Sequence, residues 1–369
     1  MDLDHKDPPG GLPTALRRTN TLTRRIPTSP QTEDEPTQSE VQSLESIEQP
    51  PSEVSQHLER KPTGPFSIHV LALLIPFSIF GALARLGLDG LANYQGRAIF
   101  PLAYAQGVGC FVMGFVVGLK EPFGRFYPPL YTALTTGFCG SLTTFSGWQL
   151  DVFNSWVDAG QYQHGGLRNF VDGVGKSTFT LAISMASISF GLQLGSVMYP
   201  FFPSLAPPNQ AVCYIITTIC ILAYAAVFAT YFLMDPDFRH QATAALLFAY
   251  PGALTRYTLS VLLNTRLQTI PLGTFLANSI GTALLGGFNV LQNKSYPVSP
   301  SACSLLQGLL DGYCGCLTTV STFVVEARGL AMRRGVRYAL FIWAWQLAKV
   351  PRLEMIGVTN TSFIDIDNV

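Results

Sequence analysis

The chain has 369 residues, of which 48% are hydrophobic and 12% are charged, and it carries no formal net charge. Soluble globular proteins contain about 25% charged residues, so this composition argues against an ordinary cytosolic enzyme. The zero net charge is the sum of two unlike parts, because residues 1–65 carry 11 acidic and 7 basic side chains whereas residues 66–369 carry 12 and 16.

The first 65 residues form a polar tail. They are rich in Pro, Ser, Thr, Gln and Glu, and the first Phe, Tyr or Trp is Phe66. Such a segment buries too little apolar surface to offset the entropy lost on ordering. We predict that residues 1–65 are a disordered cytoplasmic tail. Because the tail does not open with a basic and then an apolar run, we expect no secretory signal.

Apolar runs of about 20 residues, the length that crosses a bilayer core as a helix, follow the tail. Short connections, among them 120–125 and 160–173, carry the charges and the helix breakers. This pattern predicts an all-α integral membrane protein with nine transmembrane helices. The predicted spans are 66–88, 99–119, 129–156, 177–198, 211–234, 240–263, 271–291, 301–327 and 335–351.

The Lys and Arg residues outside these spans orient the chain. With a cytoplasmic N-terminus, 13 of them fall on the inner side and 6 on the outer side. Because cytoplasmic loops are enriched in basic residues, we predict that the N-terminus is cytoplasmic and the C-terminus extracellular. The glycosylation sequons at Asn293 and Asn360 then lie outside the cell.

Three segments of the first half recur in the second half in the same order. Gly81–Arg85 recurs as Gly252–Arg256, and Gly137–Ser146 recurs as Gly312–Ser321. One span lies between the two sets, so the second repeat enters the membrane from the opposite side. The result is two inverted four-helix repeats joined by one linker helix (4+1+4), a plan common in transport proteins. The predicted domains are the tail 1–65, a first repeat 66–198, a linker with its transmembrane helix 199–239, a second inverted repeat 240–351 and a C-terminal tail 352–369.

The third span of each repeat contains a glycine pair, two threonines and a serine. Glycines and hydroxyl side chains suit a broken helix, whose freed carbonyl groups can coordinate ions. Close packing of helices through small residues is the alternative. Both hold if the two breaks face each other, and together they could bind one cation.

An aromatic pair, Phe145 and Trp148, follows the break of the first repeat, and the equivalent positions of the second repeat hold Val320 and Phe323. Residues three apart share a helix face, and ring edges carry partial positive charge that can meet an anion. Lipid-facing or core aromatic residues are the alternative interpretation.

Charged side chains within the spans are few. Thr180, Ser184 and Ser187 share one face of the fourth span and either bind an anion or bond back to their own helix. Asp151 and Glu326 follow the aromatic pairs and are either ion-facing or interfacial.

Arg85 and Arg256 lie near span ends, where snorkelling to the interface or contacts between repeats are expected. The sequence contains neither H-E-x-x-H nor G-x-S-x-G, so metalloprotease and serine-hydrolase functions have no support. We predict that the protein is not an enzyme.

These doubled motifs resemble those of the Fluc (CrcB) fluoride channels, and the nine-helix form resembles the eukaryotic fluoride export proteins called FEX. The resemblance covers about residues 66–351. It implies an antiparallel pair of domains with two pores and a structural sodium ion between them at the broken third helices. It also implies a monomer that acts as a pseudo-dimer.

Carried over residue by residue, the family's pore positions divide unequally between the repeats. Thr274 and Asn278 match the family, whereas the first repeat has Leu102 and Gln106. The resemblance therefore implies one working pore and one vestigial pore. The working pore takes Thr274, Asn278, Phe145, Phe323, Ser184, Ser187 and Glu326. The vestigial pore takes Gln106, Val320 and Trp148. The sodium site takes Gly140, Thr143, Gly315 and Thr318.

The implied function is passive, fluoride-selective export across the plasma membrane, which confers resistance to fluoride toxicity. The expected partners are fluoride and membrane lipid, and no nucleic acid. A carrier of another small anion or metabolite is the alternative. An intramembrane enzyme is a third possibility, for which the sequence offers no nucleophile and base.

Overall fold

The structure is a computed structural model that describes residues 64–92, 100–159, 165–233, 241–267, 270–292 and 299–330, together with 335–338, 340, 341 and 344. The predictions for the N-terminal tail, the C-terminal tail, most of span 335–351 and the sequons at Asn293 and Asn360 lie outside the described residues.

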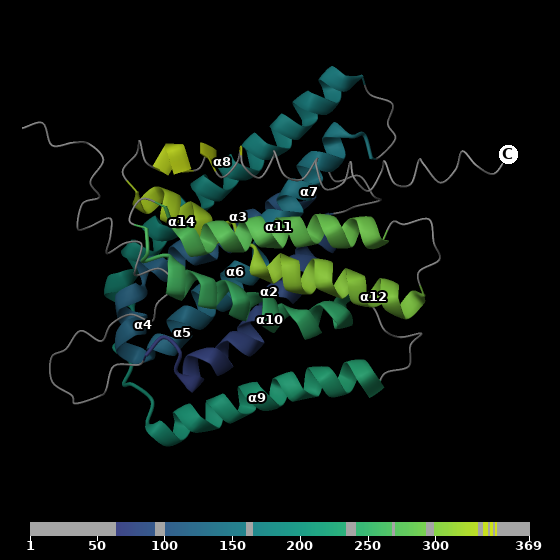
Figure 1. The fold of residues 1–369 in the computed structure, drawn as a ribbon. Helices are drawn as coiled ribbons and strands as arrows, with labels where there is room; N and C mark the ends of the chain where they lie inside the picture. The colour runs from purple at the N-terminus through teal and green to yellow at the C-terminus, as the bar shows by residue number, and fades with distance from the viewer. Residues whose placement is uncertain are drawn as a thin grey trace, which may run out of the picture. The chain divides into compact units, whose positions relative to one another are not determined.

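Helices make up all the regular secondary structure of the described residues, as predicted, and no strand occurs among them (Figure 1). The elements are α2 (Ile68–Ala92), α3 (Pro101–Gly118), α4 (Lys120–Phe126), α5 (Pro128–Thr132), the π-helix η2 (Ala133–Cys139), α6 (Gly140–Leu142), α7 (Phe145–Trp156), α8 (Gly166–Met198), the 3-10 helix η3 (Tyr199–Phe201), α9 (Gln210–Leu233), α10 (Gln241–Leu263), α11 (Leu272–Gln292), α12 (Pro300–Gly308), the π-helix η5 (Leu309–Cys314), α13 (Gly315–Leu317) and α14 (Ser321–Gly329).

Six helices in the described part of the chain are long and apolar enough to cross a membrane, or up to seven if a bent pair counts as one span. The protein is thus a multi-pass membrane protein. The predicted total of nine is not confirmed. The third span of the first repeat is divided into short pieces, α5 to α7, and most of the ninth predicted span lies outside the described residues.

Two predicted connections are helical instead. Residues 120–125 belong to α4, which is bent by 67° from α3, and α8 begins at Gly166 rather than at 177 (Figure 1). The early turns of α8 are stabilised by an ion pair between Lys176 and Asp172, 3.3 Å apart. Trp156 of α7 also stacks on Phe170, with ring centroids 6.5 Å apart.

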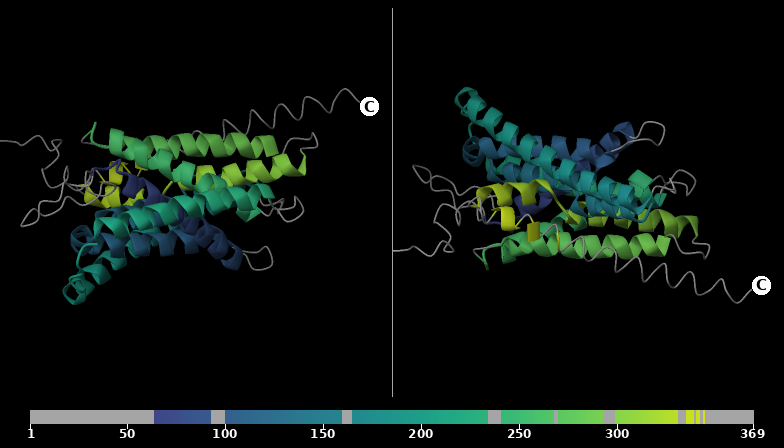
Figure 2. Two further views of the ribbon diagram at one scale, coloured as in Figure 1. Left: turned by 90° about the horizontal axis from the view of Figure 1, so that it is seen from below. Right: turned by 90° about the horizontal axis from the view of Figure 1, so that it is seen from above.

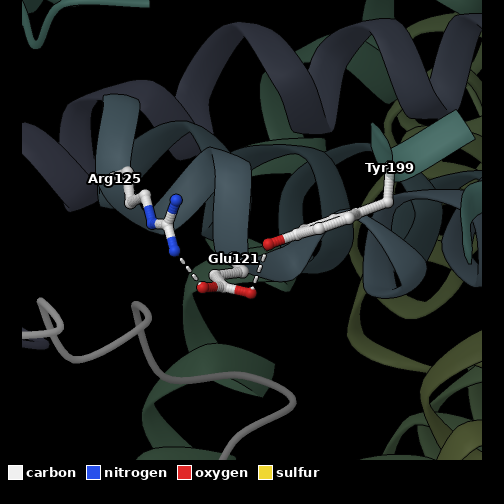
Figure 3. A network of polar contacts seen from close by, with 3 residues as sticks. All are labelled: Glu121, Arg125 and Tyr199. Atoms are coloured by element: carbon white, nitrogen blue, oxygen red, sulfur yellow. Dashed lines mark hydrogen bonds and ion pairs between the residues drawn. The ribbon is translucent and has the colours of Figure 1, made fainter. Parts of the chain in front are cut away.

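Figure 3 shows how the bent α4 is tied to the end of α8. The Glu121 carboxylate accepts a hydrogen bond from the Tyr199 hydroxyl at 2.7 Å and pairs with the Arg125 guanidinium. Because these side chains are exposed, water and salt screen the ion pair and it adds little stability. The network links α4 to the end of α8 at the point where the chain turns between α3 and α5.

The second half of each broken span packs on the opposite repeat. Helix α14 contacts α3 and α8 of the first repeat, and α7 contacts α11 of the second. Figure 2 shows the blue helices of the first repeat on one side and the green helices of the second on the other, with the yellow α14 next to the blue ones. The linker helix α9 contacts α2 and α10.

The first helix of each repeat meets the π-helix of its own repeat through a glycine. A Cβ atom on Gly81 would lie 2.5 Å from the carbonyl oxygen of Phe138, and one on Gly252 would lie 2.4 Å from that of Tyr313. These distances are too short for a real side chain, so both helices pack in direct backbone contact.

We therefore expect Gly252→Ala to lower the stability of the protein by about 1–3 kcal/mol, the usual cost of overpacking. The measurement is the thermal unfolding midpoint in detergent. The control is Gly87→Ala in α2, where an added Cβ meets nothing within 4 Å and alanine favours the helix. Equal midpoints for the two variants would contradict the packing.

Candidate functional site

The third span of both repeats leaves the helix at the same position. Helix α6 ends at Leu142, and Thr143 is extended (φ −93°, ψ 141°). In the second repeat α13 ends at Leu317, and Thr318 is extended (φ −94°, ψ 151°). The breaks fall within the predicted motifs, and each follows a π-helix, a form often found at functional sites.

Each break is capped by the other repeat. The Thr143 hydroxyl accepts hydrogen bonds from the backbone N–H groups of Val320 at 3.3 Å and Ser321 at 3.1 Å. The Thr318 hydroxyl accepts the same pair of bonds from Phe145 at 3.2 Å and Ser146 at 3.1 Å. Helix N-termini need such acceptors because their first N–H groups have no partner within the helix. Here the acceptor comes from the opposite repeat, so neither half-helix is complete alone.

Further hydroxyl groups surround the two caps. Thr143 Oγ1 lies 3.2 Å from Thr319 Oγ1, and Thr318 Oγ1 lies 3.1 Å from Thr144 Oγ1. Ser146 Oγ lies 2.9 Å from Thr318 Oγ1. All are buried, so the centre of the protein is a polar cluster enclosed by helices.

Two of the buried amide side chains, Asn278 and Gln106, bind the backbone at the breaks, and they do so differently. Asn278 pairs with the Thr319 backbone on both sides: Oδ1 accepts from the N–H at 2.8 Å, and Nδ2 donates to the carbonyl at 3.1 Å. Gln106 donates from Nε2 to the Thr144 carbonyl at 2.6 Å, but Gln106 Oε1 has no hydrogen-bond partner in the described part of the chain. The extra methylene of Gln thus breaks the symmetry between the repeats.

A chain of buried rings joins the repeats. Phe145 and Phe323 meet edge to face, with ring centroids 5.9 Å apart. Phe145 also meets Trp148 edge to face at 5.2 Å, and Phe323 contacts Tyr338 at 5.5 Å. The structure therefore brings together the two phenylalanines expected in one pore.

Glu326 is almost fully buried, with 1% of its surface exposed, and hydrogen-bond donors surround it. Oε1 accepts from Thr274 Oγ1 at 2.6 Å and from Asn264 Nδ2 at 3.1 Å, and Oε2 accepts from the Tyr338 hydroxyl at 3.1 Å. Asn264 also accepts from the Thr274 N–H at 3.1 Å. Asp151, the counterpart of Glu326, is partly exposed.

Asn264 and Tyr338 were not expected from the sequence. Asn is ordinary just after the last turn of a helix, so nothing marks Asn264 as more than a cap. Tyr338 lies in the predicted ninth span, where tyrosines often mark the membrane interface.

The hydroxyl groups of α8 lie against α3, the helix that carries Gln106. Ser184 lies beside Cys110 and donates back to the Thr180 carbonyl at 2.7 Å, so back-bonding is present there. Ser187 Oγ is 3.6 Å from the position of a Cβ on Gly107.

Arg85 and Arg256 are 3% and 0% exposed. The expected contacts between repeats are present, since both side chains turn inward and bind the opposite repeat. The expectation of snorkelling is wrong, because neither side chain reaches the surface. Within the described residues no three His, Cys, Asp or Glu side chains are grouped for a metal.

Residues 72–192 and 243–355 match the family described as CrcB-like protein, Camphor Resistance (CrcB). The two matches cover more than half of the chain, and each overlaps one sequence repeat. The chain belongs to the CrcB family.

Several proteins similar to this CrcB chain carry functional names. Fluoride export protein 1 of Candida albicans is 33% identical over 296 residues, which cover 73% of this chain and 75% of that protein. Fluoride export protein 1 of Schizosaccharomyces pombe is 31% identical over 274 residues, covering 71% of this chain and 88% of that protein.

A bacterial relative covers a shorter region. Fluoride-specific ion channel FluC 1 of Staphylococcus epidermidis is 43% identical over 75 residues, 20% of this chain and 58% of that protein. No solved structure matches the chain. CrcB is a channel and exporter family and not a class of enzymes.

The reciprocal caps predict a large effect for one hydroxyl group of this CrcB protein. Thr318→Val leaves two buried N–H groups without an acceptor, and we expect a loss of about 2–4 kcal/mol of stability. Thr143→Val should cost a similar amount, because its cap has the same geometry. The measurement is thermal unfolding of the purified protein.

Thr218→Val is the control, since its exposed hydroxyl bonds only to its own helix, at Tyr214. We expect little change for this variant. A Thr318→Val protein as stable as the Thr218→Val protein would refute the cap.

Proposed function

We propose that this CrcB protein is a fluoride-selective channel that exports fluoride passively and protects the cell from its toxicity. The observation that carries the proposal is the edge-to-face pair of Phe145 and Phe323, one from each repeat. Phe323 lies four residues after Thr319, whose backbone Asn278 binds. The relatives named as fluoride exporters and fluoride channels support the choice of ion.

The physical requirement is to replace water around a small anion. Moving such an ion into a low-dielectric interior costs tens of kcal/mol unless its hydration is replaced. Amide and hydroxyl donors and the positive edges of rings supply this without a Lys or Arg that would hold the ion too tightly. An inside-negative potential then drives the anion outward with about 2.3 kcal/mol per 100 mV.

In this proposal the two pathways are unequal. The twofold pairing of Asn278 with Thr319 supports a preorganised pathway. By contrast, the Gln106 side-chain oxygen has no hydrogen-bond partner among the described residues, and Trp148 packs against Phe145. The working pore consists of Thr274, Asn278, Phe145, Phe323 and Glu326, with Ser184 and Ser187 from α8, and the vestigial pore of Gln106, Val320 and Trp148.

The membrane arrangement is also part of the proposal. We infer nine spans in a 4+1+4 order, a plasma-membrane location, a cytoplasmic N-terminus and an extracellular C-terminus. The reciprocal caps support a single chain that acts as a pseudo-dimer, since one chain supplies both sides of the interface. The exposed apolar residues of α9, such as Ile215, Ile219 and Leu222, suit contact with membrane lipid.

A structural sodium ion fits the oxygen atoms at the two breaks. The hydroxyls of Thr143 and Thr318 already accept two N–H bonds each, which uses both lone pairs. The carbonyl groups of Gly140, Thr143, Gly315 and Thr318 would therefore hold the ion, because they end the first half-helices, where carbonyls lack intrahelical partners. A sodium ion there would offset the negative ends of the helix dipoles.

The test is efflux of fluoride and chloride from liposomes that contain the purified protein. We expect rapid fluoride efflux and little chloride efflux. Asn278→Asp should reduce fluoride efflux by at least about 100-fold, because unit charges about 4 Å apart repel by about 4 kcal/mol near a protein surface. Phe323→Ile should also abolish it.

Gln106→Asp and Trp148→Ile are the matched variants on the other pathway, and we expect them to retain fluoride efflux. Equal chloride efflux, or none for fluoride, would reject the channel. Loss of efflux in the Gln106 and Trp148 variants, with normal efflux in the Asn278 and Phe323 variants, would reverse the assignment of the pores.

The Glu326 cluster predicts a second functional residue. In the proposed orientation α14 runs toward the cytoplasm, so Glu326, Asn264 and Tyr338 lie toward the inner mouth. Asn264→Leu removes one donor to Glu326, and we expect fluoride efflux to fall about tenfold, the equivalent of one hydrogen bond to a charge at about 1.5 kcal/mol. Asn209→Leu, which removes an exposed bond to the Val212 N–H, should leave efflux unchanged. Equal efflux from both variants would exclude a role for Asn264.

A further inference from the structure

Two buried guanidinium groups lie at equivalent positions of the repeats and outside the pore residues named above. Arg85 is on α2 and Arg256 on α10, within the recurring motifs Gly81–Arg85 and Gly252–Arg256. They are 3% and 0% exposed. A charge so deep in the protein is costly unless polar groups compensate it, so the partners of these side chains indicate their role.

Each arginine crosses to the π-helix of the opposite repeat. Arg256 donates from Nη2 to the Thr136 carbonyl in η2 of the first repeat, at 2.7 Å, and from Nε to the Cys316 carbonyl in α13 of its own repeat, at 3.0 Å. Arg85 donates from Nη2 to the Asp311 carbonyl in η5. Thr136 and Asp311 each directly precede the recurring glycine motif, so both arginines bind the same position of the opposite π-helix.

A glycine provides the space for each guanidinium. A Cβ atom on Gly140 would lie 2.4 Å from both Nη1 and Nη2 of Arg256, and one on Gly315 would lie 2.4 Å from both of those atoms of Arg85. Any other residue at these two positions would push the guanidinium away. The glycines of the break are therefore binding surfaces for the arginines as well as helix breakers.

The location of the guanidinium groups is electrostatically favourable. The half-helices ending at Leu142 and Leu317 present the negative ends of their dipoles at the breaks, and cations are stabilised there. Each arginine thus contacts a half-helix of the other repeat through its π-helix and its break glycine, and Arg256 also binds the end of the half-helix of its own repeat at Cys316. Phe145 begins the next helix three residues after Leu142, and Thr319, the partner of Asn278, follows Leu317 by two.

We propose that Arg85 and Arg256 are positioning residues for the conduction pathway, each setting the helix break of the opposite repeat through its glycine. The contact of Arg256 with Gly140 sets the position of Phe145. The contact of Arg85 with Gly315 sets the position of the Thr319 backbone, to which Asn278 hydrogen-bonds. The inference rests on the proposed fluoride function and names the residues that position the helix breaks along its pathway.

A double-mutant cycle tests the pairing. Gly140→Ala and Arg256→Lys should each lower fluoride efflux per folded protein by about tenfold, because a pathway this narrow depends on sub-ångström placement. If the glycine acts by leaving space for the guanidinium, Gly140→Ala should not lower fluoride efflux any further in a protein that already carries Arg256→Lys. The matched control combines Gly315→Ala with Arg256→Lys, whose effects should multiply because Gly315 seats Arg85.

The fluoride-to-chloride efflux ratio separates positioning from stability. A purely structural arginine would lower the amount of folded protein and leave this ratio unchanged, so an unchanged ratio in Arg256→Lys overturns the proposal. The proposal is also overturned if the effects of Gly140→Ala and Arg256→Lys on fluoride efflux multiply. It is overturned as well if the control pair, Gly315→Ala with Arg256→Lys, shows the same coupling as the test pair. If Gly140→Ala alone does not fold, recovery of folded protein on adding Arg256→Lys supports the seat, and no recovery refutes it.

The same cycle read by thermal unfolding distinguishes this inference from the proposed function. A wild-type protein without fluoride efflux would end the channel proposal. In that case the unfolding midpoints could still show energetic coupling of Gly140 with Arg256 and of Gly315 with Arg85. Such coupling would support the two arginine–glycine contacts as structural, without a role in conduction.

Discussion

The donation of two backbone N–H groups to a threonine hydroxyl of the opposite repeat determines the centre of this protein. A helix that starts in the middle of a membrane protein has no water to satisfy its first amides. Thr143 satisfies α14, and Thr318 satisfies α7. Because the caps are exchanged, the two halves of the chain cannot separate without leaving four backbone N–H groups without their acceptors. The same caps fix the starts of the two helices that carry Phe145 and Phe323.

The remaining central contacts follow from this exchange. The arginines hold the ends of the first half-helices, the threonines hold the starts of the second, and Asn278 holds the link between them in the second repeat. Backbone carbonyl and amide groups are the partners in all three cases. The side chains that line the proposed pathway are thereby left to meet the ion, with their positions set by main-chain geometry.

Much of the architecture could be predicted from the sequence, because apolar length and a doubled glycine and threonine motif are local signals. These signals were enough to predict the helix breaks and the family. The pairing of Phe145 with Phe323 was predicted from the resemblance to the family. The early start of α8 was missed although Asp172 and Lys176 have the i,i+4 spacing of a helical ion pair. The stack of Trp156 on Phe170 joins two helices, and the local spacing does not reveal it. Asn264 and the inward turn of Arg85 depend on long-range contacts, which no local pattern encodes.

The exchanged caps also constrain how such a chain can evolve. In a dimer of identical subunits, a substitution at a pore position alters both pores, whereas a fused chain can lose one pore and keep the other. Yet the repeat that carries Gln106 and Trp148 cannot be deleted, because its Thr143 starts the helix that bears Phe323 and Glu326. The first repeat would therefore remain under selection even after its own pathway has lost conduction, because it starts this helix and also supplies Phe145 to the proposed working pore.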